Sequence, residues 1–241
     1  MNPELVLDIN VKISDCDAFG RWRPSNILGY TQEMAEIHAA SFGLDRNTML
    51  GSGVCWIIYR QTVRMHAYPT YHDQVRITTW PGTVEGPVFP RCFVMERPDG
   101  TRIGEIVSSW LLMNVETRRP QRPSMLPREI PRNDREPPLP LPPMLRVEGA
   151  EAIGARGVCY SDLDVNGHMN NTRYIDWICD ALGTEAMREK GLSRLQVNYI
   201  AEAQPGEMLE LSMKRAGEDI LLAGRRASDQ KTVFESSVSF A

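Results

Sequence analysis

A short segment occurs twice in this 241-residue chain, once complete and once degraded. Residues 161–171 read SDLDVNGHMNN, and residues 14–24, 147 positions earlier (161 against 14), read SDCDAFGRWRP. Ser, two Asp and Gly recur in register, whereas Asn166 and His168 face Phe19 and Arg21. Both copies keep turn-forming residues, but only the second keeps side chains that move protons or polarise a carbonyl. The repeat therefore predicts two copies of one fold, of which only the second has side chains suited to catalysis.

The elements around the two copies are expected in the same order. The first half predicts a strand, a helix beginning at Pro24, and four more strands. The first-half strands are expected near 5–13, 54–66, 73–80, 88–96 and 101–113. The second half predicts a short strand, a helix from residue 170 or 171, and further strands. These strands are expected near 156–160, 195–201, 207–215, 220–227 and 231–240.

The repeat extends beyond the turn. Residues 73–77 match residues 207–211 in charge and in alternation, which places Tyr68 opposite Glu202. Each half then consists of one helix covered by an antiparallel meander, an α+β layer. A sheet wrapped around a central helix is the hotdog fold. The chain is therefore expected to be a tandem double hotdog of class α+β.

A proline-rich segment divides the chain. Nine of the 17 prolines lie between residues 114 and 149. Proline fixes φ and removes a hydrogen-bond donor, so this segment is expected to run extended across the surface as a semi-rigid tether. The predicted domains are an N-terminal hotdog at 1–125, a linker at 126–148 and a C-terminal hotdog at 149–241.

The composition of the chain limits which binding partners and which cellular compartment are expected. The formal charge of −4 and pI near 5.7 favour neither nucleic acid nor an anionic membrane. No apolar run approaches the roughly 18 residues that span a bilayer, and the N-terminus has no secretory pattern. Five scattered cysteines without Cys-x-x-Cys spacing predict reduced thiols, a cytoplasmic location and no zinc site.

Residues 161–174, SDLDVNGHMNNTRY, resemble the active-site segment of the acyl-ACP thioesterases of plant plastids and their bacterial relatives, apart from Gly167 and Met169. RQTV at 60–63, TWP at 79–81 and SWLLM at 109–113 add weaker likeness, which covers nearly the whole chain. The resemblance implies a hydrolase of fatty acyl-ACP in fatty acid biosynthesis and lipid metabolism, without metal or redox cofactor. It also implies that the first hotdog shapes the acyl pocket and the second carries the site.

The residues of the second turn suit thioester hydrolysis, which needs an activated water or nucleophile and donors for an oxyanion. His168 has an ordinary pKa near 6.5 and suits proton transfer near neutral pH. Asp164 and Asn166 precede it by four and two residues, an alternation that allows all three side chains to face one cavity. Backbone N–H groups at the start of the following helix are expected to serve as oxyanion donors.

The resemblance adds Glu202 to this set. The plant enzymes carry Glu followed by Cys after the helix, and the matching pair here is Glu202-Ala203. A cysteine nucleophile is thereby excluded at that position. The hypothesis is that Glu202 and His168 activate water, while Asp164 and Asn166 orient His168 and the carbonyl.

Three alternatives stay open at this point. The same chemistry on acyl-CoA fits the motif equally well. A hotdog hydratase or dehydratase is disfavoured because its Asn-Pro and following His are not found, and a non-catalytic acyl-thioester-binding protein would lack turnover.

An acidic carrier protein is a candidate partner for the arginines of the proline-rich region, which are otherwise interpreted as part of a solvated tether. These are Arg118, Arg119, Arg122, Arg128, Arg132 and Arg135. Monomer and homodimer are both compatible with the internal duplication.

Overall fold

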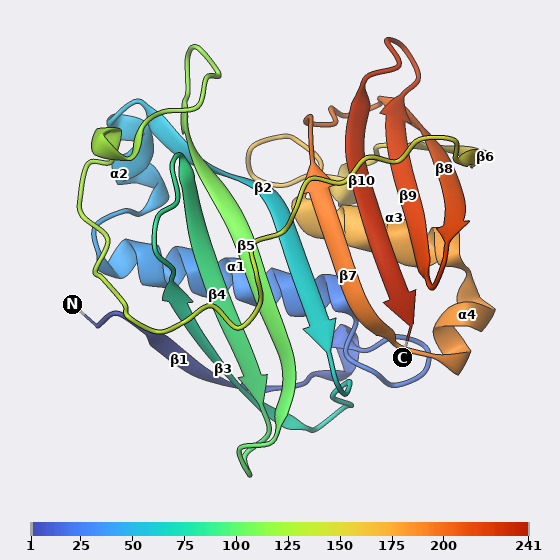
Figure 1. Cartoon of the computed structure of the whole chain (residues 1–241), viewed down its shortest axis with the longest axis horizontal. Coiled ribbons are helices and arrows are strands. Elements are labelled where there is room, and N and C mark those ends of the chain that lie inside the picture. Colours follow the sequence, from blue (N-terminus) through green and yellow to red (C-terminus); the bar gives the residue numbers. More distant parts are fainter. Residues whose placement is uncertain (1, 241) are drawn as a thin grey trace. The chain divides into compact units, whose positions relative to one another are not determined.

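The computed structural model describes residues 2–240, whose contacts divide into two compact units. The first contains the chain up to Arg23 together with Ile27–Pro142, and the second contains Pro24–Asn26 and the chain from Pro143 onward. Each unit contains five antiparallel strands and one long helix (Figure 1).

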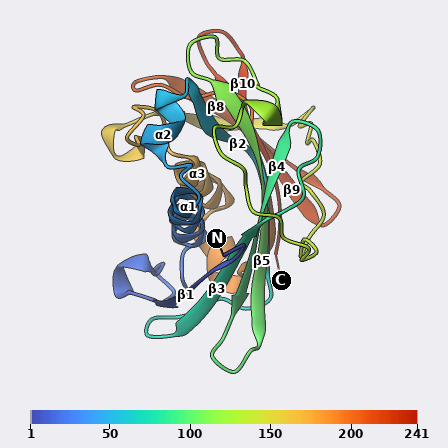
Figure 2. The same cartoon turned by 90° about the vertical axis from the view of Figure 1, so that its left-hand side faces the viewer.

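In the first unit, the strands are ordered β1-β3-β4-β5-β2. They are β1 (Leu5–Asn10), β2 (Val54–Met65), β3 (Gln74–Pro81), β4 (Val88–Glu96) and β5 (Arg102–Asn114). The helix α1 (Pro24–Ser41) lies along one face of this sheet (Figure 2). It begins with proline at its first position, as predicted, because the missing N–H has no partner within a helix start. A short helix, α2 (Arg46–Gly51), was not expected; the Asp45 carboxylate caps it.

In the second unit, the strands are ordered β6-β8-β9-β10-β7. They are β6 (Glu151–Gly157), β7 (Leu192–Tyr199), β8 (Met208–Ala216), β9 (Asp219–Arg226) and β10 (Thr232–Phe240). Two helices accompany them, α3 (Asn171–Leu182) and α4 (Thr184–Glu189). The strand predicted near 156–160 is wrong in its bounds, since β6 begins at Glu151 and Tyr160–Asp162 forms a 3-10 turn.

The strand order of the second unit repeats that of the first, element by element. The two repeated turns, at residues 14–24 and 161–171, also share their backbone hydrogen bonds. Asp17 N–H donates to the Arg21 carbonyl at 2.8 Å, and Asp164 N–H donates to the His168 carbonyl at 2.9 Å. Gly20 and Gly167 have φ of +78° and +75°, a left-handed conformation that favours glycine. The predicted internal duplication is confirmed.

The predicted pairing of Tyr68 with Glu202 follows from the same comparison. Trp22 N–H donates to the Pro69 carbonyl at 2.7 Å, and Met169 N–H donates to the Ala203 carbonyl at 3.0 Å. In each unit the turn is thus hydrogen-bonded to the residue that directly follows the compared one: Pro69 follows Tyr68, and Ala203 follows Glu202. The loop after β7 therefore holds Glu202 beside the second turn.

Around Leu139 the proline-rich segment packs closely on the surface of the first unit. Leu139 is 4% exposed and clusters with Trp80, Cys92 and Val94. Cys92 faces away from α1, since the neighbouring Arg91 contacts His38 of that helix. The segment therefore covers the outer face of the sheet, and this explains why β4 is buried on both faces.

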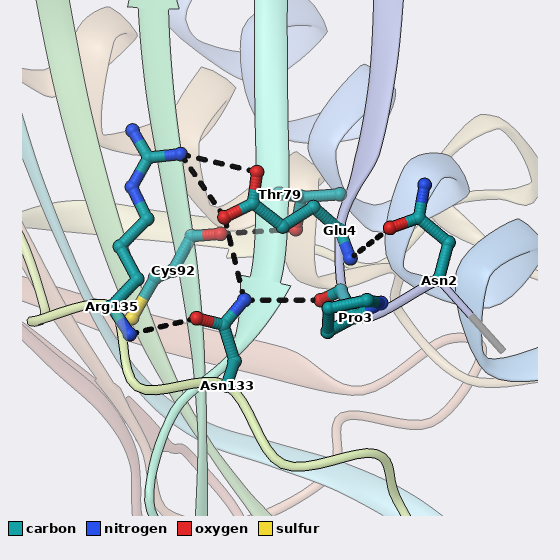
Figure 3. A network of polar contacts seen from close by, with 7 residues as sticks. All are labelled: Asn2, Pro3, Glu4, Thr79, Cys92, Asn133 and Arg135. Carbon is teal, nitrogen blue, oxygen red and sulfur yellow. Dashed lines mark hydrogen bonds and ion pairs between the residues drawn. The ribbon is translucent and has the colours of Figure 1, made fainter.

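The N-terminus and the proline-rich segment are joined by a polar network (Figure 3). Asn133 Nδ2 donates to the Pro3 carbonyl at 3.2 Å, and the Arg135 guanidinium lies 3.3 Å from the Glu4 carboxylate. The same guanidinium stacks 4.0 Å from the ring centroid of Trp80. The segment runs over the surface, as predicted, but it is not a solvated tether at Leu139, which is buried against the sheet. The domain limits 1–125, 126–148 and 149–241 stay a prediction.

Candidate active site

His168 and Glu202 come together in the second unit. His168 lies in the turn between the Tyr160–Asp162 3-10 turn and α3, and Glu202 lies in the loop between β7 and β8. His168 Nδ1 is 3.5 Å from Glu202 Oε2, with the side chains 26% and 35% exposed. The pair is accessible to solvent and to a substrate. Its separation is longer than an ordinary hydrogen bond.

Asp164 and Asn166 are coupled to each other within the turn. The Asp164 carboxylate accepts the Asn166 N–H at 2.8 Å and lies 3.4 Å from Asn166 Nδ2. The backbone N–H of Asp164 also donates to the His168 carbonyl at 2.9 Å. Asp164 therefore fixes both the conformation of the turn and the amide of Asn166, while the exposed Asn166 side chain is presented at the surface.

The start of α3 supplies fewer oxyanion donors than expected. Asn170 caps the helix, with its Oδ1 accepting the Thr172 N–H at 2.8 Å. The Asn170 carbonyl accepts the Arg173 N–H at 2.9 Å. We expected the first backbone N–H groups of the helix to be unpaired. This is wrong for Thr172 and Arg173, whose N–H groups are bonded to the capping residue Asn170.

The loop that carries Glu202 is held by several elements. Ile200 and Ala201 N–H groups donate to the Val233 carbonyl at 2.8 and 3.1 Å, which continues the pairing of β7 with β10. Met169 N–H binds Ala203, so one residue links the loop to the turn of His168. Ala203 itself is completely buried.

Tyr174 of α3 reaches the same loop from the core. Burial raises the pKa of Tyr174 strongly, and a hydrogen bond with the backbone of Ala203 acts in the opposite direction. A bond that favours the phenolate comes from a donor, so the backbone group is the Ala203 N–H. The ring of Tyr174 packs edge-on against Tyr199 and Phe234.

Arg226, at the end of β9, was not identified from the sequence. Its guanidinium donates to the Glu202 carbonyl at 2.8 Å and lies 3.0 Å from the carboxylates of Glu207 and Asp229. Nothing in the local sequence distinguishes Arg226 from the adjacent Arg225. The strand alternation alone separates them, since Arg225 is exposed and only 16% of the Arg226 side chain is.

The other histidines lie in the first unit. His38 is 2% exposed and accepts a hydrogen bond at Nδ1 from Arg91, so it is a packed histidine of the core. His66 pairs with Glu105 at 2.8 Å. Among residues 2–240, no three His, Cys, Asp or Glu side chains group as a metal ion requires, and no helix is long and apolar enough to cross a membrane.

Comparisons with known families match both units. A family model described as the acyl-ACP thioesterase N-terminal domain matches residues 7–129, and one described as the acyl-ACP thioesterase C-terminal domain matches residues 150–235. A chloroplastic palmitoyl-acyl carrier protein thioesterase of Cuphea hookeriana is 28% identical over 76% of this chain and 48% of its own. A chloroplastic oleoyl-acyl carrier protein thioesterase of Coriandrum sativum is 27% identical over 80% of this chain and 58% of its own. The chain thus spans about half the length of the curated relatives it matches.

Solved structures are similar over the whole chain. An acyl-ACP thioesterase from Bacteroides thetaiotaomicron has a TM-score of 0.91 at 23% identity, covering 99% of this chain and 98% of its own. A 12:0-ACP thioesterase from Umbellularia californica has a TM-score of 0.81 at 18% identity, covering 100% and 98%. These similarities confirm the predicted α+β fold of two hotdogs in tandem.

Proposed function

This chain belongs to the acyl-ACP thioesterase family, and on that premise we propose that it hydrolyses the thioester of fatty acyl-ACP to a free fatty acid and the carrier thiol. The observation that supports the proposal most directly is the His168–Glu202 pair, 3.5 Å apart beside an intact turn. The first unit has Arg21 and Tyr68 at the two corresponding positions, so only the second unit has this pair.

The pair suits general-base activation of water. With the Nδ1 proton of His168 directed to Glu202, the Nε2 lone pair takes a proton from water, and the hydroxide attacks the thioester carbonyl carbon. The C–S bond of the tetrahedral intermediate then breaks. The imidazolium returns its proton to the departing thiolate, so the products are one carboxylic acid and one thiol.

Asn166 is the proposed donor to the oxyanion. Its amide is held by Asp164 at the surface of the turn, and Thr172 and Arg173 N–H groups are already bonded within the helix cap. A side-chain amide is an established kind of oxyanion donor. Asp164 acts through Asn166 and through the carbonyl of His168.

Acyl-ACP is proposed as the carrier substrate because the curated relatives named above are acyl carrier protein thioesterases. We further propose that the first unit shapes the acyl pocket and that the protein acts in the cytoplasm. Free cysteines at all five positions fit a reducing compartment.

The test is the release of free thiol from C8 to C18 acyl-ACPs and from the matching acyl-CoAs. We expect His168→Asn to lower kcat for acyl-ACP by about 10²- to 10⁴-fold, the usual contribution of a general base. His72→Asn in the first unit is the matched control, since His72 is exposed and asparagine tolerates its φ of +73°.

Each outcome has a distinct meaning. His168-dependent release from acyl-ACP supports the proposal and reports the preferred chain length. Faster release from acyl-CoA keeps the mechanism and replaces the carrier. Binding of both carriers without release would show a non-catalytic acyl-thioester-binding protein. Undiminished turnover by Glu202→Gln would remove the carboxylate from the mechanism.

A further inference from the structure

We propose that Arg226 is a positioning residue that sets the place of Glu202 beside His168. The proposal rests on the proposed function, because it assigns Arg226 a part in that reaction. Arg226 donates from one terminal nitrogen to the Glu202 backbone carbonyl at 2.8 Å. The contact thus fixes the main chain from which the side chain of Glu202 extends.

The guanidinium is itself fixed on two sides. Its Nε forms an ion pair with Glu207 Oε1 at 3.0 Å, without the geometry of a hydrogen bond, and its other terminal nitrogen lies 3.0 Å from Asp229 Oδ2. A planar guanidinium with three partners has little freedom to turn, unlike a lysine ammonium on a flexible chain. Arg226 is the last residue of β9. The Glu202 carbonyl is therefore anchored to a strand of the sheet.

Glu207 joins the far end of the same loop to this network. Its Oε2 accepts the Gln204 N–H at 2.9 Å, while its Oε1 pairs with Arg226. One guanidinium therefore holds the loop at Glu202 and, through Glu207, at Gln204. Residues 201–206 have no strand ladder of their own, so these contacts replace the hydrogen bonds that a sheet would supply.

The first unit shows the same loop with its arginine in a different place. There Asp73 Oδ2 accepts the Thr70 N–H at 2.8 Å, as Glu207 accepts that of Gln204. Arg97 N–H binds the Thr101 carbonyl, as Arg226 N–H binds that of Lys231. The side chain at the corresponding position, Arg97, is exposed. The closing carboxylate is common to both units, whereas the mostly buried arginine belongs to the unit that has His168 and Glu202.

The expected consequence is a loss of turnover without a loss of binding. Displacement of a catalytic group by about 1 Å costs on the order of 100-fold in rate. We therefore expect Arg226→Gln to lower kcat for acyl-ACP by about 100-fold with KM unchanged, and Arg226→Lys to retain an intermediate kcat. Arg225→Gln is the matched control, because Arg225 is adjacent, exposed and on the opposite side of β9.

A double-mutant cycle distinguishes positioning from general stabilisation. If Arg226 acts through Glu202, then adding Arg226→Gln to a Glu202→Gln variant lowers kcat no further. A full additional loss in the double variant would overturn the proposal, as would equal kcat values for Arg226→Gln and Arg225→Gln. Thermal melting of every variant identifies any that do not fold, and Arg226→Lys then provides the comparison.

A second readout does not depend on turnover. The Met169 N–H donates to the Ala203 carbonyl, next to Glu202, and its hydrogen exchange reports whether the loop stays in place. We expect this exchange to accelerate in Arg226→Gln but not in Arg225→Gln, with β10 amides unchanged in both. Unaltered exchange in Arg226→Gln would overturn the proposal even in a protein without thioesterase activity. If the wild type hydrolyses neither carrier but exchange still accelerates in Arg226→Gln, the proposed function is refuted while Arg226 is still shown to hold the loop of Glu202.

Discussion

Replacing Tyr174 by phenylalanine tests whether the loop of Glu202 is held from the core. The substitution removes one hydroxyl and keeps the ring, whose centroid lies 5.6 Å from that of Tyr199 and 5.2 Å from that of Phe234. What is lost is the hydrogen bond with the backbone of Ala203. Since Ala203 is 0% exposed, water cannot replace the missing partner.

The magnitude follows from the group left behind. A buried donor without an acceptor costs about 1–3 kcal/mol, more than the net value of an ordinary hydrogen bond. For a chain of this size, each kcal/mol lowers Tm by roughly 2–4 °C. Burial raises the pKa of Tyr174 above its ordinary value of 10, so its stabilising contribution is complete below pH 10 and is lost only above that. Ionisation of Tyr174 therefore has no part in a measurement at pH 7.

The assay is urea unfolding at pH 7, with Tyr199→Phe as control. The Tyr199 hydroxyl donates to the Asn171 carbonyl at 3.1 Å, but its side chain is half-buried and water can take its place. We expect Tyr174→Phe to lower the urea midpoint at unchanged m-value, and Tyr199→Phe to lower it less. A Tyr174→Phe protein as stable as the wild type, or more stable than Tyr199→Phe, would refute the reasoning.

Three further predictions concern stability. Burial lowers the pKa of His38, so its contribution is present above pH 6.5 and is lost as pH falls below it; His38→Gln should flatten that dependence in urea titrations at pH 7.5 and 5.5. Leu139→Ala should cost about 2–5 kcal/mol by urea unfolding if the proline-rich segment is part of the core, and less than about 0.5 kcal/mol if it is a loose tether. Gly224→Ala should cost about 1–3 kcal/mol, because its Cβ would collide with the ring of Phe234, and Phe234→Leu in the same chain should recover part of the loss; additive costs would contradict the collision.

Much of the fold was predictable because its signals are local. Alternating strands, the proline at the first position of α1 and the glycine of each turn depend on a few neighbouring residues. The errors are also local in origin. The strand near 156–160 was misplaced because exposed β6 lacks the apolar alternation that marks a half-buried strand. The six-residue helices α2 and α4 are too short to show a clear helical period.

The Pro-rich segment shows a different failure. Its prolines correctly excluded a helix and a central strand, since each removes a donor and fixes φ. How closely such an extended segment packs on the surface depends on what that surface exposes. Leu139 is buried because the outer face of the first sheet presents Trp80, Cys92 and Val94 to it. That complementarity is absent from the segment itself.

By itself, the sequence determined the duplication and the turn that carries Asp164, Asn166 and His168, because one repeated segment shows both; it also determined the α+β class, because helical and alternating apolar patterns are local. The tertiary structure decided which groups from distant segments meet. The ladder of β7 with β10 brings Glu202 to 3.5 Å from His168, and the alternation of β9 turns Arg226 inward and Arg225 outward. A difference of one residue in strand register reverses the side to which a residue points, and register is set by the packing of the whole sheet.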